Sequence, residues 1–67
     1  MDLDLRQAII VNIKGKTEDQ LKDMIKTSIA DNEEKTLPGL GVIFEVIWKN
    51  SDTDMQEQMV ENLFKNI

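Results

Sequence analysis

Cysteine, histidine and tyrosine are absent from this sequence, and proline, glycine and aromatic residues are scarce. Without cysteine the chain can form no disulfide, thiolate metal site or cysteine nucleophile, which favours an intracellular protein. Without histidine, acid–base chemistry would fall on carboxylates and lysines, and the sequence shows no convergent set of them. We therefore predict a protein that is not an enzyme and that has no catalytic, cofactor-binding or metal-binding residues.

Long hydrophobic runs are also missing. The longest nearly uncharged stretch covers residues 36–44, far short of the roughly 18 apolar residues that a membrane span needs. The acidic start, with Asp2 and Asp4, lacks the basic segment that opens a signal peptide. Gly39 and Gly41 lack the lysine and hydroxyl of a phosphate loop. We expect no membrane segment, no secretion signal and no small-molecule ligand.

Acidic residues outnumber basic ones by 13 to 8, which gives a net charge of −5. Nucleic-acid affinity comes largely from cations that displace the counterions of phosphates, so this balance opposes it. The nearest approach to a cationic cluster comprises Arg6, Lys14, Lys16, Lys22 and Lys26. Because acidic residues lie among these cations, we expect a mixed solvated face. A nucleic-acid-associated role is the alternative rather than the main prediction.

Apolar residues at helical spacing open the chain. Leu5, Ile9 and Ile13 lie four residues apart, which predicts a first helix, although the β-branched run at 9–11 leaves a strand as an alternative. Further apolar residues beside this stripe predict a helix embedded on more than one side. Gly15 fits the end of the helix, because glycine tolerates positive φ.

A second helix is predicted from Thr17, because Thr17 and Gln20 have the spacing of a capping box. Its apolar stripe predicts a core face of Leu21, Met24, Ile25, Ser28 and Ile29. The pattern fades near Asn32, where we expect the helix to end.

The only proline and two of the three glycines lie in the next segment. Pro38 and Gly39 predict a turn within a loop over residues 35–41. The β-branched residues that follow would suit a strand, but a lone strand would lack partners, so we predict a helix over 40–49. In that helix Glu45 is expected to pair with Lys49 one turn later. The alternative is a buried Glu45 carboxyl with a raised pKa.

The last helix is predicted from a helix start at Ser51-Asp52-Thr53-Asp54 and from the apolar residues that follow at helical spacing. The fold class is therefore all-α, a small single-domain bundle of about four short helices over residues 1–67. The third helix, which follows the Pro-Gly loop, is apolar on nearly every side. We predict that it is central and largely buried, with Gly39 and Gly41 allowing its neighbours to approach closely.

Several segments carry a resemblance to a known family. They are residues 2–9, Asn12, Gly15, the pair Glu34-Lys35 and the run from Leu37 to Trp48. In order and spacing they resemble the small acid-soluble spore protein I family of spore-forming Firmicutes. The resemblance implies synthesis in the developing forespore and residence in the spore core, as a minor acid-soluble protein. It implies no known biochemical activity.

The predicted role is therefore structural or protein-binding, in sporulation and dormancy. If the apolar surface of the third helix is incompletely covered, Leu40, Phe44 and Trp48 are the predicted partner contacts, because large aromatic side chains dominate interface energies. The predicted partners are a second copy of the chain or another spore-core protein.

Overall fold

The computed structural model describes the backbone of residues 2–67 and the side chains of residues 5–67, and this part of the chain is helical without a strand. The elements are α1 (Asp2–Ile13), α2 (Glu18–Asp31), the 3-10 turn η1 (Glu34–Thr36), α3 (Leu37–Lys49) and α4 (Thr53–Lys65). The predicted all-α class and its four helices are confirmed. The strand alternatives for residues 9–11 and 40–49 are excluded.

The boundaries of α2 follow the sequence signals. The side chain of Thr17 accepts from the Gln20 amide at 3.2 Å, and the Gln20 side chain accepts from the Thr17 amide at 3.0 Å, which completes the capping box. The helix ends at Asn32, whose φ of 54° is left-handed. Gly15, between α1 and α2, has a φ of 85°. These three predictions are confirmed.

The predicted loop over residues 35–41 is wrong, because α3 already begins at Leu37. The Thr36 hydroxyl donates to the Glu33 carbonyl at 2.7 Å and holds the 3-10 turn that precedes the helix. Pro38 lies in the first turn of α3, where its missing N–H leaves no hydrogen bond unmade. Gly39 and Gly41 are helical, and a Cβ on either would meet no atom within 4 Å. The predicted close approach at these glycines is therefore also wrong.

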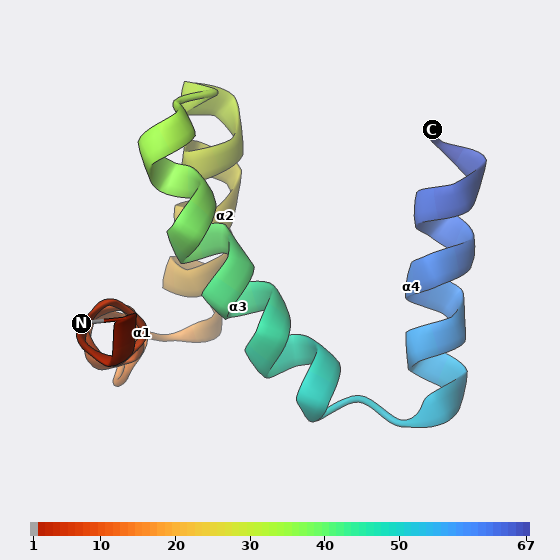
Figure 1. Ribbon diagram of the computed structural model, residues 1–67, viewed down its shortest axis with the longest axis horizontal. Helices are drawn as coiled ribbons and strands as arrows, with labels where there is room; N and C mark the ends of the chain where they lie inside the picture. The colour runs from red at the N-terminus through yellow and green to blue at the C-terminus, as the bar shows by residue number, and fades with distance from the viewer. Residues whose placement is uncertain (1) are drawn as a thin grey trace.

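The helices form an open arrangement (Figure 1). Among the described elements, α3 makes its most extensive helix–helix contact with α1, and it follows α2 through the tight turn at η1. The last helix, α4, rises beside α3 but stands apart from it, so that the two form the arms of a V. The C-terminal end of the chain lies at the tip of the free arm.

Burial differs from the prediction. Of the described side chains only Val42 is buried, at 9% exposure. The third helix is central in its contacts, but it is not largely buried, because α1 covers one side of it and α4 turns away. Leu5 and Val11 on α1 are exposed, so the embedding of that helix is also wrong. The predicted core position of Ile29 on α2 is wrong too, because Ile29 is 62% exposed.

The bend between α3 and α4 is held by local hydrogen bonds. The side chains of Asn50 and Ser51 donate to carbonyl oxygens in the last turn of α3, at 2.8 and 2.6 Å. Asp52 caps α4 by accepting from a first-turn amide at 2.8 Å, so the predicted helix start is confirmed with Asp52 as its cap. Gln56 reaches back from α4 and donates to the Trp48 carbonyl at 2.8 Å. Local bonding thus sets the direction of α4.

The open arrangement is visible in the size of the molecule. A compact protein of 7.7 kDa exposes about 4,300 Å², whereas this chain exposes 5900 Å². Its radius of gyration is 13.0 Å, against about 11 Å for a compact chain of this length. The chain therefore carries an excess of roughly 1,600 Å² of surface over a compact fold.

Candidate protein-interaction surface

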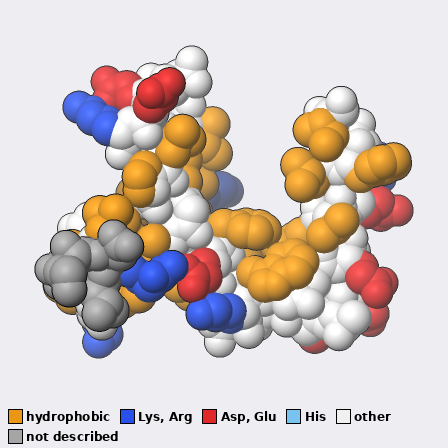
Figure 2. Space-filling view, in the orientation of Figure 1, with side chains coloured by type: hydrophobic (Ala, Val, Ile, Leu, Met, Phe, Trp, Pro, Cys, Tyr) orange, Lys and Arg blue, Asp and Glu red, His pale blue; other side chains and the backbone are white. Residues whose placement is uncertain are grey.

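An apolar row runs along one side of α3. Leu37, Phe44 and Trp48 are spaced seven and four residues apart, which places them above one another on a helix. Phe44 is 50% exposed, and its ring centroid lies 5.9 Å from that of Trp48 in a tilted arrangement. Hydrophobic side chains gather over the lower part of α3 and over α4 in Figure 2. This row contains two of the three predicted partner-contact residues.

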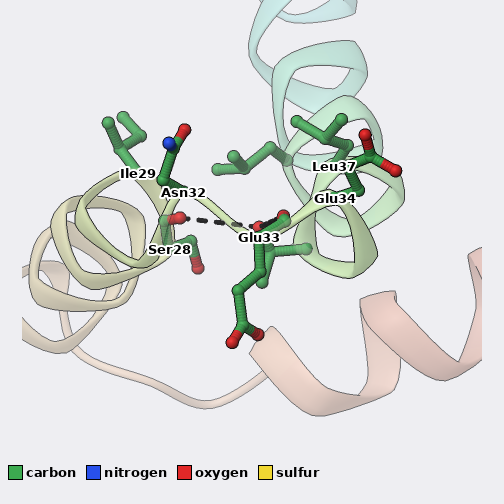
Figure 3. A pocket seen from close by; sticks show the side chains of 8 residues that line it. Ser28, Ile29, Asn32, Glu33, Glu34 and Leu37 are labelled. Carbon is green, nitrogen blue, oxygen red and sulfur yellow. Dashed lines mark hydrogen bonds between the residues drawn. The ribbon is translucent and has the colours of Figure 1, made fainter.

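The third predicted contact, Leu40, lies in different surroundings. It lines a small depression of about 230 Å³ at the turn between α2 and α3, together with Ile29 and Leu37 (Figure 3). The Thr36 hydroxyl closes this turn by approaching the Ser28 carbonyl at 3.5 Å. Leu40, Phe44 and Trp48 therefore follow one another along α3 instead of forming one pocket. Their role as partner contacts stays a prediction.

The acidic residues around this depression form no metal centre. The Glu33 carboxylate pairs with Lys35 at 3.3 Å. Within the described part of the chain, no three side chains of His, Cys, Asp or Glu are grouped to hold an ion. The turn is a structural feature of the α2–α3 connection.

An apolar groove lies between α2 and α3, and we call it the α2–α3 groove. It has a volume of about 410 Å³. Its apolar residues are Ile13, Leu21, Met24, Ile25, Ile43, Val46 and Ile47, and its charged residues are Glu18, Lys22 and Lys26. The sequence pattern places these apolar residues on the apolar faces of their helices. It did not predict that the groove between the helices stays open.

A second apolar surface lies on α4. Val60, Leu63 and Phe64 are 50%, 60% and 77% exposed. Val60 and Phe64 line a cleft that opens toward Trp48, and Figure 2 shows hydrophobic side chains on both of its sides. The apolar stripe that the sequence places on the last helix is therefore present, but the chain itself does not cover it.

The best-defined polar contact joins α1 to α3. The Glu45 carboxylate lies 3.0 Å from the Lys49 ammonium and 3.1 Å from the Arg6 guanidinium. Hydrogen bonds from Lys49 first, and then from Arg6, lower the pKa of Glu45 from its ordinary value. The predicted pair with Lys49 is confirmed, and a buried carboxyl with a raised pKa is wrong. Sequence reasoning missed Arg6, because 39 positions separate it from Glu45.

The fold and these surfaces define a small all-α protein with exposed apolar helix faces, and none of the described helices is long and apolar enough to cross a membrane. The family model for small, acid-soluble spore protein I matches residues 3–67. Proteins of that name from Bacillus cereus (strain AH187) and Bacillus anthracis (strain A0248) are each 51% identical over 63 residues, which cover 94% of this chain and 91% of theirs. The chain belongs to the small, acid-soluble spore protein I family, and it is a spore protein. No solved structure matches it.

Proposed function

We propose that this spore protein works without catalysis, as a structural or protein-interaction component of the spore core during sporulation and dormancy. The observation that carries the proposal is the excess of roughly 1,600 Å² of surface over a compact fold of the same mass. Large hydrophobic side chains are exposed on both α3 and α4. Exposed apolar patches on a small protein mark interaction sites.

The row on α3 supplies the proposed contacts. Phe44 and Trp48 offer two adjacent aromatic rings in a tilted arrangement, and Leu40 lies one turn before Phe44 on α3. Aromatic side chains of this kind contribute a large share of the energy of protein interfaces. The row therefore suits a protein partner with an apolar surface of its own.

The charges of the chain favour this role over nucleic-acid association. Arg6 and Lys49 are engaged by Glu45, and Lys35 is engaged by Glu33. The net charge of −5 opposes binding to phosphates. Binding to protein is therefore the function that we propose.

Site-specific photo-crosslinking in sporulating cells tests this function. A photoreactive amino acid placed at Phe44 is expected to form an adduct with protein, recovered from the spore core after the outer layers are removed. The same probe at Asp23, an exposed polar position on α2, is the matched control and should form no such adduct. An adduct with DNA, equal labelling at both positions, or recovery only from the outer layers would contradict the proposal.

A further inference from the structure

We infer that the partner is a second copy of this chain, and that α4 of each copy lies in the α2–α3 groove of the other. This inference rests on the proposed interaction role and names its partner. The α2–α3 groove and the apolar side of α4 that carries Met55 and Leu63 are two apolar surfaces that the chain leaves uncovered. A reciprocal exchange of the last helix covers both of them at once, with the closed two-fold symmetry that is usual in homodimers.

The area at stake is sufficient for a stable dimer. Each chain exposes roughly 1,600 Å² more than a compact protein of its mass. If two copies bury this excess against each other, the interface reaches about 3,200 Å², which lies within the range of obligate homodimers. A single chain leaves this area in water.

The groove is long enough to hold most of α4. The 13 residues of α4 span about 20 Å, and residues 18–26 of α2, which line the groove, span about 14 Å. Met55, Met59 and Leu63 recur every four residues on α4, which is the anchor spacing of a helix that lies in an apolar groove.

Charge complementarity supports the same pairing. The polar side of α4 carries Asp54, Glu57 and Glu61, with Lys65 as the only cation on the helix. The charged residues of the groove include Lys22 and Lys26 beside a single acid, Glu18. An acidic helix in a groove that carries more cations than acids pairs opposite charges around an apolar centre.

The chain's own α4 is held away from its own groove. Its bend is fixed by the side chains of Asn50 and Ser51, by the Asp52 cap and by the bond from Gln56 to the Trp48 carbonyl. Closing α4 onto its own groove would break this set of bonds. Exchange between copies keeps the bend and still covers the groove.

Size-exclusion chromatography with light scattering gives the first test. The chain is expected at twice its monomer mass of 7.7 kDa. Leu63→Glu, on the apolar side of α4, should raise the dimer dissociation constant by at least about tenfold. Gln58→Glu adds the same charge on the polar side of α4 and should leave the dimer intact. Circular dichroism checks that both variants keep their helices.

Single cysteines then locate the contact, because the chain has no cysteine of its own. Val46→Cys lies in the groove and Leu63→Cys lies on α4. When the two variants are mixed and treated with a short bis-maleimide, the main product should join one of each, and such a product cannot arise within one chain. A predominance of Leu63→Cys joined to itself would overturn the exchange.

The failures of the two proposals can be told apart. A monomer at every concentration, or a dimer that Leu63→Glu does not weaken, overturns the exchange of α4. The interaction role survives that result if the probe at Phe44 captures a different protein in spores. If the probe at Phe44 forms no protein adduct and the chain is a monomer at every concentration, the interaction role itself is wrong.

Discussion

The part of the chain from α1 to α3 and the last helix, α4, are held in different ways. Contacts distant in sequence join α1 to α3, including the ion pair between Arg6 and Glu45, and α3 also carries the buried Val42. In contrast, α4 is held by bonds to residues no more than eight positions away, such as Gln56 to Trp48. An isolated helix of 13 residues is marginal in water. The difference indicates that α4 depends on its caps and on local hydrogen bonds more than the other helices do.

The largest expected effect comes from placing an aspartate in each of the two parts and comparing the loss of stability. Val42→Asp places a carboxylate at the only described side chain that is buried, and should cost at least about 3 kcal/mol in the free energy of unfolding. Val60 on α4 is half exposed, so Val60→Asp should lower the free energy of unfolding by less than about 1 kcal/mol. Urea unfolding followed by circular dichroism, in solution dilute enough for the monomer, measures both. Equal costs would show that α4 packs as tightly as the other helices.

Removing the cap of α2 and the cap of α4 compares the same two parts, with a smaller expected effect. Thr17→Ala and Asp52→Ala each remove a side-chain cap, at about 1 kcal/mol for the helix concerned. The loss at Thr17 should lower the midpoint of global unfolding, because α2 is tied to α3 through η1 and Thr36. The loss at Asp52 should leave that midpoint nearly unchanged, and should speed amide exchange within α4 by roughly fivefold. Native-state hydrogen exchange distinguishes the two.

A matching drop in the global midpoint for Asp52→Ala would contradict this view. It would place α4 in the same cooperative unit as α1 to α3. That outcome is also expected if the measurement is made on the dimer, so it must be made at concentrations at which light scattering shows a monomer.

The local structure of this protein could be predicted from its sequence. The Thr17 capping box, the left-handed Asn32 and the positive φ of Gly15 each depend on residues only a few positions apart. The error at Pro38 has a local cause as well. Proline followed by glycine is typical of a turn, but the same proline also suits the first turn of a helix, and the hydrogen bonds of Thr36 favour the helix.

The arrangement of the helices could not be predicted in the same way. The apolar stripes that contain Ile29, Leu63 and Phe64 indicate helix faces that would be buried in a contact. The sequence pattern is the same whether that contact is made within this chain or with a second one. The sequence therefore predicted a buried third helix where the structure leaves an open groove. Phe44 is predicted as a partner contact because it is large and apolar. The groove itself was missed because it exists only between helices.

The smallest expected effect concerns the ion pair that ties α1 to α3. Because Lys49 and Arg6 lower the pKa of Glu45 in the folded protein, the unfolded chain takes up the proton first as the solution is acidified. The stabilisation by Glu45 should be fully present above its ordinary value of 4.5, and should be lost as the pH falls through the lowered value. Glu45→Gln should therefore be less stable than the parent at pH 7 and equal to it in strong acid, as measured by thermal melts. Lys49→Gln should shrink this difference more than Arg6→Gln, since the bond from Lys49 lowers the pKa most. If Glu45→Gln melts like the parent at pH 7, the ion pair does not stabilise the contact between α1 and α3.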